Sequence, residues 1–485
     1  MKLSELLREV ECEGSYDGEI DVNNITDNTE KVKGATAFVC IKHRNFDGHC
    51  AAVRAIKKGA CAVITQNYLG VKNEIEVKST REAYAKLCAE LYLHPERKLN
   101  MTAVTGTNGK TTVVNLLRQI YEKAGRKCGS LGTVENLLGD KKESPHLTTE
   151  KPPELYKMLN EMYKSGCERC IMEASSQALV QGRLIGINFD TAIFTNITPE
   201  HLDYHKSFES YLESKLILFK NAKKAVINLD SPRSDSFIKM SQNYVTYSVK
   251  DNNADYTAKN IKLKETCVSY EIVSKGKIFH IEYPNIGLFS VYNSMAAAVA
   301  AIENDVEIKD IQKALKNARN VEGRAEELGF NLPFKIYVDY AHTQDSLEQI
   351  LIALKEICKN NLTVVFGCGG DRDKGKRPQM MNTACSLADR VIVTSDNPRT
   401  ENPDKIIEDI LKGKGKSKCR VITEPDRRKA IFIALKMAVK DDIILLAGKG
   451  HEKYQIIGNE FLPFDERKEV KKILTEFPIF KGDET

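Results

Sequence analysis

The chain has 485 residues, with 72 lysines and arginines against 67 aspartates and glutamates and a formal net charge of +5. This length predicts two to four domains, and the near balance of charge excludes a polybasic nucleic-acid-binding protein. No stretch has the pattern of a signal peptide or of a membrane span, so we expect no membrane partner. The 13 cysteines form no framework, which is typical of reduced thiols in the cytoplasm, and we expect Cys167 and Cys170 to pack in the core rather than bind zinc.

The first 98 residues are predicted to form a small α/β domain. Residues 36–41 and 62–65 are typical of strands, and residues 51–58 are typical of a helix. A linker is expected where His94 and Pro95 interrupt the pattern.

Residues 99–325 are predicted to form a second domain around a mostly parallel sheet. Four short apolar runs alternate with helical stretches, at residues 101–104, 171–172, 192–194 and 225–229. Such alternation indicates a sheet that is covered on both faces. Residues 255–283 alternate with a period of two around Lys275 and Gly276, which predicts an antiparallel flank on this sheet.

Residues 326–485 are predicted to form a third, doubly wound α/β domain. Its expected strands are residues 336–338, 362–366, 391–394, 421–422 and 443–446. Polar clusters follow four of them, beginning at Asp339, Gly367, Ser395 and Gly448, and should meet at the carboxyl edge of one sheet, where such folds bind ligands. The lysine-rich residues 412–418 are expected to form a solvated loop.

The central domain begins with a phosphate-binding pattern, TGTNGKTT at residues 105–112. It lies between a predicted strand and an amphipathic helix, so its backbone N–H groups and the helix N-terminus can hold phosphate. Lys110 can reach the terminal phosphates and Thr111 can ligate magnesium. A strict P-loop has glycine where Val104 stands, so this is a shortened variant that predicts nucleotide binding.

Two other side chains at strand ends are candidate metal ligands. Glu173 ends one predicted strand, and His201 follows another. Each also has a simpler interpretation, as an exposed carboxylate or as a helix cap. Magnesium prefers oxygen ligands, but the shared sheet edge favours the metal interpretation.

Seven motifs, in this order, resemble those of the Mur ligases: TGTNGKTT at 105–112, MEASSQALVQGR at 172–183, HLDYH at 201–205, DYAHTQDSL at 339–347, GCGGDRDKGKRP at 367–378, DNPR at 396–399 and GKGHEKYQ at 448–455. The resemblance implies a three-domain α/β architecture. It comprises an N-terminal UDP-binding domain, a P-loop-like central ATPase domain and a Rossmann-like C-terminal domain that delivers an amino acid.

The resemblance also implies an activity in cytoplasmic peptidoglycan precursor synthesis. A monomeric, ATP-dependent amide ligase would add meso-diaminopimelate to the D-Glu γ-carboxylate of UDP-N-acetylmuramoyl-L-Ala-D-Glu through an acyl phosphate. A carboxylate is a poor acyl donor until it is phosphorylated, and phosphoryl transfer between anions requires positive charge.

Site residues follow from the resemblance motif by motif. The implied catalytic residues are Lys110, Lys215, His201 and Glu173, and the implied Mg²⁺ ligands are Thr111, Glu173, His201 and Lys215 as a carbamate. The implied ATP contacts are Gly106, Thr107, Asn108, Gly109, Lys110, Thr111, Thr112, Asn293, Arg324 and Asp345. The implied UDP-muramoyl-peptide contacts are Asn28, Thr148, Thr149, Ser175, Gln181 and Arg183, and the amino-acid contacts are Arg372, Asp396, Asn397, Pro398, Arg399, Gly448 and Glu452.

The arginine of the DNPR motif favours diaminopimelate over lysine. Diaminopimelate carries a second carboxylate, which the fork of Arg399 can bind bidentately, while Glu452 can pair with an ammonium group.

Departures from the family pattern leave alternatives open. Asn28, Thr29 and His43 differ from the usual uridine-binding residues, so a divergent ligase with another acceptor, or with L-lysine, remains an alternative. Folate-polyglutamate or cyanophycin-type ligation is disfavoured by the DNPR and GKGHE motifs. A nucleotide-dependent switch that makes no bond is the alternative of a different class, and it has no need for the arginines of the third domain.

Overall fold

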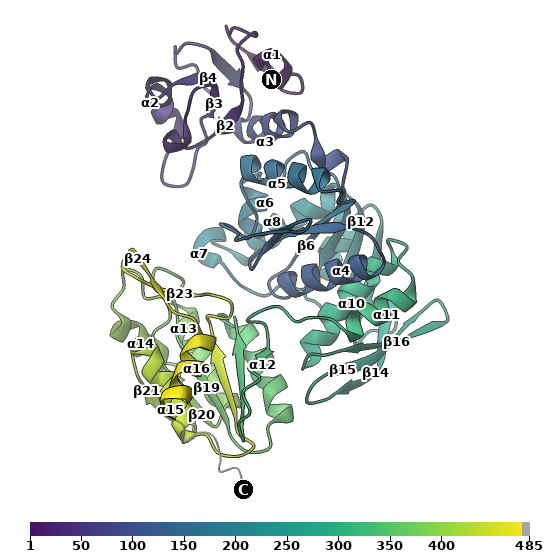
Figure 1. Cartoon of the computed structure of the whole chain (residues 1–485), viewed down its shortest axis with the longest axis vertical. Coiled ribbons are helices and arrows are strands. Elements are labelled where there is room, and N and C mark those ends of the chain that lie inside the picture. The colour runs from purple at the N-terminus through teal and green to yellow at the C-terminus, as the bar shows by residue number, and fades with distance from the viewer. Residues whose placement is uncertain (478–485) are drawn as a thin grey trace.

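The computed structural model describes residues 1–477, and its main sheets follow one another along the chain (Figure 1). The first sheet has the order β1-β5-β4-β3-β2. Its strands are β1 (Cys12–Glu13), β2 (Asn24–Thr26), β3 (Thr36–Val39), β4 (Ala60–Thr65) and β5 (Glu74–Val77), and its helices are α1 (Leu3–Leu6), α2 (Ala52–Lys57) and α3 (Thr80–Leu91). Between β2 and β5 the strands pair in parallel, as expected for a small α/β unit.

The second sheet has eleven strands in the order β16-β15-β14-β13-β12-β11-β6-β10-β7-β8-β9. From β14 to β7 all neighbours are parallel. The parallel strands are β6 (Asn100–Thr105), β7 (Cys128–Leu131), β10 (Arg169–Glu173), β11 (Phe189–Phe194), β12 (Ala222–Asn228), β13 (Tyr244–Ser248) and β14 (Tyr256–Leu263). The predicted antiparallel flank is confirmed by β15 (Val268–Ser274) and β16 (Lys277–Tyr283). A second antiparallel flank was not predicted and consists of β8 (Asn136–Leu138) and β9 (Lys141–Glu143).

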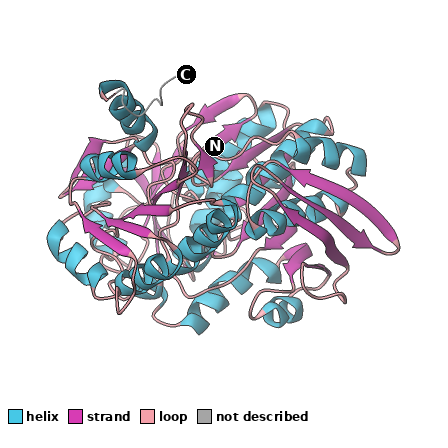
Figure 2. Ribbon diagram, turned by 90° about the horizontal axis from the view of Figure 1, so that it is seen from below, coloured by secondary structure: helices cyan, strands magenta, loops and turns pink. Residues whose placement is uncertain are grey.

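Helices cover both faces of the second sheet, and Figure 2 shows helices around the strands. In β6, Met101 and Ala103 belong to one core cluster and Val104 to another, as the alternation of side chains in a strand requires. The helices of the first face are α5 (Pro152–Lys164), α6 (Ser176–Val180), α8 (Phe208–Lys220) and α9 (Ser234–Met240), with α7 (Leu202–His205) beside α8. Those of the second face are α4 (Lys110–Lys123), α10 (Leu288–Ile302) and α11 (Ile308–Lys316). The first core cluster continues from the first sheet into the second, joining Ile64 and Leu87 to Phe194.

The third sheet has the order β17-β18-β22-β19-β20-β21, and all but the edge strand β17 (Glu326–Glu327) are parallel. The parallel strands are β18 (Lys335–Asp339), β19 (Leu362–Phe366), β20 (Arg390–Val393), β21 (Arg420–Thr423) and β22 (Ile443–Ala447). The helices are α12 (Gln344–Ile357), α13 (Lys376–Leu387), α14 (Pro403–Leu411), α15 (Arg427–Met437) and α16 (Glu466–Glu476). A separate hairpin, β23 (Tyr454–Ile457) and β24 (Glu460–Pro463), was not predicted. The boundaries at 98/99 and 325/326 stay predictions.

Two expectations from composition concern the core and the membrane. Cys167 and Cys170 lie in the first core cluster, and burial raises the pKa of both thiols. Within residues 1–477, the helices are all too short or too polar to cross a membrane.

Candidate active site

The phosphate-binding pattern forms a tight loop between β6 and α4, as predicted. Gly106 and Gly109 have φ angles of 151° and 87°. A Cβ at Gly106 would lie 1.9 Å from Oγ1 of Thr195, and one at Gly109 would lie 2.3 Å from Oδ1 of Asn293. Both positions therefore require glycine, because the backbone must approach neighbouring side chains closely.

Two lysine side chains, one buried and one half-buried, meet beneath this loop. Nζ of Lys110 and Nζ of Lys215 both donate to the carbonyl oxygen of Gly106, at 2.8 and 2.9 Å. Burial lowers the pKa of Lys110, and burial together with the charge of Lys110 holds the pKa of Lys215 well below its usual range. The two lysines lie far apart in the sequence, so the structure brings together two residues that only the resemblance connected.

Oxygen ligands gather on the other side of the loop. Oγ1 of Thr111 donates to Oε1 of Glu173 at 3.0 Å, and Thr133 donates to the same carboxylate from its backbone N and its hydroxyl, at 2.7 and 3.1 Å. Nη2 of Arg324 donates to Oγ1 of Thr111 at 3.2 Å. Glu173 is therefore a fixed, buried carboxylate, and the exposed-carboxylate interpretation of it is wrong.

His201 lies near Glu200 and His342, which were not predicted to belong to the site. It is the N-cap residue of α7, with a φ of 55°, and its Nε2 lies 3.8 Å from Oε2 of Glu200. Nε2 of His342 lies 3.5 Å from Oε1 of the same carboxylate. Burial opposes ionisation of Glu200, but His342, His201 and Lys110 together hold its pKa well below the usual range. The adjacency of Glu200 to His201 was the only sequence signal for it.

A cavity of about 470 Å³ connects these groups. Its lining includes all the predicted catalytic residues and most of the predicted peptide contacts: Lys110, Glu173, His201, Lys215, Thr148, Thr149, Ser175, Gln181 and Arg183. It also includes Thr111 and Arg324, predicted to contact ATP, and Arg372, predicted to contact the amino acid. A second cavity of about 480 Å³ shares Asn108, Gly109, Thr112 and Arg324 with it and adds Asn293 and Asp345. Nδ2 of Asn108 donates to Oδ2 of Asp345 at 2.7 Å, which links the loop to α12 of the third sheet.

Arg183 is held in place at the floor of the first cavity. It donates to Oε1 of Gln181 from Nε and Nη2, at 3.0 and 2.7 Å, and to the carbonyl oxygen of Thr149. Oγ1 of Thr149 donates to the carbonyl oxygen of Glu173 at 2.7 Å. Asn28 lies apart from this group, where its Oδ1 accepts from the backbone N of Glu30 and caps a 3₁₀ turn.

The DNPR and GKGHE motifs lie together at the carboxyl edge of the third sheet. Nζ of the buried Lys449 donates to Asp396, Asn397 and Glu452, at 3.4, 3.1 and 3.2 Å. Burial and the charge of Asp396 raise the pKa of Glu452. Nη1 of Arg399 donates to the carbonyl oxygen of Gly370 at 2.8 Å. Asp396, Asn397 and Glu452 are thus brought together around Lys449, as topology indicated, whereas Arg372 lines the cavity at the phosphate loop.

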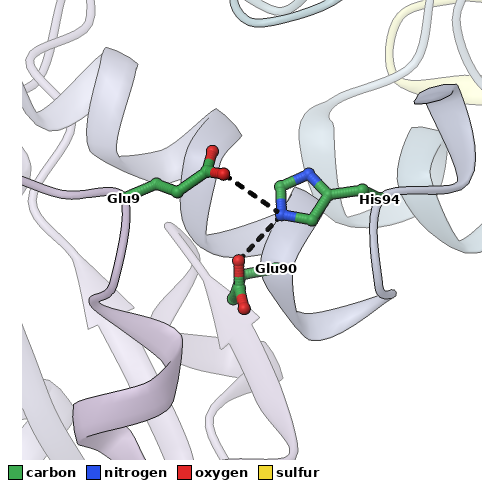
Figure 3. Close-up of side chains that lie close together, drawn as sticks. All are labelled: Glu9, Glu90 and His94. Atoms are coloured by element: carbon green, nitrogen blue, oxygen red, sulfur yellow. Dashed lines mark hydrogen bonds and ion pairs between the residues drawn. The ribbon is translucent and has the colours of Figure 1, made fainter.

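A separate cluster of metal-ligating residue types lies at the end of the first unit (Figure 3). Nε2 of His94 lies 2.7 Å from Glu90 and 3.9 Å from Glu9, and its Nδ1 lies 3.0 Å from Glu96. Glu96 and Glu90 thus each lie within hydrogen-bond distance of one ring nitrogen. These contacts explain the cluster, which joins α3 to the linker.

Two family models match the chain. The Mur ligase middle domain matches residues 104–301, and the Mur ligase glutamate ligase domain matches residues 323–450. The chain belongs to the Mur ligase family and is an ATP-dependent ligase.

Two relatives that span nearly the whole chain carry the same activity name. The chain is 39% identical over 485 residues to UDP-N-acetylmuramoyl-L-alanyl-D-glutamate–2,6-diaminopimelate ligase 1 of Clostridium acetobutylicum, covering 98% of this chain and 100% of that protein. It is 41% identical to the ligase of the same activity name from Caldanaerobacter subterraneus, covering 98% and 99%. A solved structure of a ligase with this name matches with a TM-score of 0.71 at 33% identity, covering 98% and 99%. The MurF structure from Acinetobacter baumannii, at 16% identity and a TM-score of 0.65, shares the fold.

Proposed function

We propose that this chain adds meso-2,6-diaminopimelate to the D-Glu γ-carboxylate of UDP-N-acetylmuramoyl-L-Ala-D-Glu, with ATP as the energy source, in peptidoglycan synthesis. The relatives' activity name supports the substrates. The observation that carries the reaction type is the cavity in which Lys110 and Glu173 from the phosphate-loop sheet face Arg183 and, across the units, Arg372. A nucleotide-dependent switch has no use for that combination.

Positive charge from the chain would favour the first chemical step. Nζ of Lys110 now donates to the carbonyl oxygens of Gly106 and Thr107 at 2.8 and 2.7 Å, so it is already aimed across the loop that would hold the phosphates. Lys110 can offset the repulsion between a substrate carboxylate and the γ-phosphate. Arg183 can hold the peptide carboxylate, because Gln181 and Thr149 fix its guanidinium.

The oxygen ligands of the site suit Mg²⁺. Thr111 and Glu173 already contact each other through the atoms that would bind it, with His201 at the rim of the same cavity. When bound, Mg²⁺ would neutralise phosphate charge. Burial and the charge of Lys110 lower the pKa of Lys215, which favours the neutral amine that carbamylation by CO₂ requires, and the resulting carbamate could serve the metal.

The second step would use the third sheet. The fork of Arg399 would take the distal carboxylate of diaminopimelate, and Glu452 with Asp396 would take an ammonium group. We assign residues 1–98 to the UDP part of the acceptor, residues 99–325 to ATP and residues 326–485 to the amino acid. We expect a cytoplasmic monomer.

The test is phosphate release from ATP in the presence of UDP-N-acetylmuramoyl-L-Ala-D-Glu, with meso-diaminopimelate, with L-lysine or with no amino acid. We expect release only with diaminopimelate, and a product that is heavier by one diaminopimelate residue in mass spectrometry. Release with L-lysine but not with diaminopimelate would mean that L-lysine is the amino-acid substrate. Release that needs no amino acid and gives no product would favour a nucleotide switch, and ATP binding without any release would indicate another acceptor.

A further inference from the structure

One buried arginine, Arg427, and one partly buried arginine, Arg467, lie beneath the loop that connects β22 to β23. Arg427 is the first residue of α15, and Arg467 is the second residue of α16. Glu466, the first residue of α16, is fully buried and accepts from Nε and Nη2 of Arg427 at 2.9 and 2.7 Å. We call Arg427, Glu466 and Arg467 the clasp.

Arg427 connects two strand-end loops of the third sheet. Its Nη2 donates to the carbonyl oxygen of Ala447 at 2.8 Å, and its Nη1 to that of Ser395 at 3.4 Å. Ala447 is the last residue of β22, and Ser395 directly precedes Asp396 of the DNPR motif. One guanidinium therefore fixes the spacing between the starts of both loops.

Arg467 holds the same loop from its far side. It donates to Glu326 of β17 from Nε, at 3.0 and 3.1 Å to the two carboxylate oxygens, and from Nη2 at 2.5 Å. Its Nη1 donates to the carbonyl oxygen of Gly450 at 3.0 Å. Gly450 has a φ of 51°, and a Cβ there would lie 2.6 Å from Cβ of Tyr340. Gly450, in the middle of the loop, therefore cannot move without breaking its hydrogen bond with Arg467.

A buried ion pair costs desolvation, and well-packed apolar residues in its place are often equally stable. Apolar residues could not hold the loop as the clasp does, because each arginine donates a hydrogen bond to a carbonyl oxygen of the loop. Between those two carbonyls and the hairpin lies Glu452, whose backbone N donates to the carbonyl oxygen of Lys449 at 2.9 Å. Movement of Ala447 or Gly450 would therefore move Glu452.

We propose that Arg427 and Arg467 are positioning residues that fix the loop at residues 448–452 and so set the position of the Glu452 carboxylate for the incoming amino acid. This inference rests on the proposed function of Glu452. The hydrogen bonds that make up the clasp do not depend on it.

The test compares Arg427→Lys and Arg467→Lys with Arg428→Lys as the matched control. Lysine keeps the charge but cannot bridge a carboxylate and a carbonyl as the guanidinium does. Arg428 is the next residue of α15 and pairs with Glu476 at 2.7 Å on the surface, where its side chain is 44% exposed. Steady-state kinetics and hydrogen exchange of the peptide that covers residues 448–452 are measured on the full chain.

We expect both clasp variants to raise the KM for diaminopimelate about tenfold, the effect of losing one hydrogen bond to a charged group. The KM for ATP should stay unchanged, and amide exchange in residues 448–452 should accelerate, while Arg428→Lys matches wild type in all three. A general loss of stability would instead raise exchange throughout the third sheet, and that result overturns the proposal.

Unchanged exchange in the loop, or faster exchange with an unchanged KM for diaminopimelate, also overturns it. If the wild-type chain does not turn over diaminopimelate at all, the proposed function fails, and exchange alone then decides whether the clasp fixes the loop. Arg467 is partly exposed, so Arg467→Lys remains informative if Arg427→Lys does not fold.

Discussion

Replacing Arg399 with alanine should remove the preference for diaminopimelate. Arg399 has a φ of 51°, a region that strains arginine and alanine alike, so the change should leave the backbone as it is. In the part of the chain that the structure describes, one N–H group of its guanidinium, at Nη1, has a hydrogen-bond acceptor. The others remain for a substrate carboxylate.

The size of the effect follows from those remaining donors. Two charge-assisted hydrogen bonds contribute ~1.5 kcal/mol each at the low end, which is appropriate for a half-buried side chain. The loss of ~3 kcal/mol corresponds to a fall of roughly 150-fold in kcat/KM. L-Lysine has hydrogen where diaminopimelate has the distal carboxylate, so its kcat/KM should change little.

The assay is phosphate release at varied concentrations of each amino acid, with Arg420→Ala, an exposed arginine of β21, as the control. An equal loss with both amino acids would mean that Arg399 acts on the fold of the loop and not on the carboxylate. A change below about threefold with diaminopimelate would refute the assigned contact altogether.

Three other outcomes are expected. Removing CO₂ from the buffer should lower activity and bicarbonate should restore it, whereas Lys215→Ala should be inactive under both conditions. Wild-type activity that does not depend on CO₂ would contradict a carbamate. Gly106→Ala should abolish ATP binding in calorimetry and lower the melting temperature, because its Cβ would lie 1.9 Å from Oγ1 of Thr195; normal binding would show that the loop can yield. Burial, with nearby Arg324 and Arg467, lowers the pKa of His451 to about 3. As pH falls below about 6.5, the unfolded chain takes up this proton before the folded chain does. The free energy of unfolding should therefore drop by about 1.4 kcal/mol per pH unit towards pH 3 from this group. Urea titrations of His451→Gln should show a smaller dependence of this free energy on pH.

Local patterns predicted the elements whose signal lies within a few residues. The TGTNGKTT segment combines glycines with a buried strand and an amphipathic helix, and the structure has β6 ending at Thr105 and α4 beginning at Lys110. The strands of the third sheet were predicted because each is a short apolar run, and four of them are followed by a polar cluster. Parallel topology then places those clusters at one edge.

Features that depend on packing between distant segments could not be predicted. His342 reaches Glu200 only because the second and third units contact each other. Strands β8 and β9 have three residues each, too few for alternation to show. Lys215 is a buried lysine on α8, whereas a lysine in a helix is ordinarily exposed, so its place in the site was predicted from the family resemblance alone.

The continuity of the core between the first and second sheets has a consequence for how the chain unfolds. One apolar cluster includes side chains from both sheets, whereas the third sheet has clusters of its own and shares mainly Ile286 and Phe289 with the second. The first two units should therefore melt as one cooperative block and the third as another. A fragment that starts near residue 323 has the apolar interior needed to fold alone, whereas a fragment that ends near residue 98 would expose half of an interior.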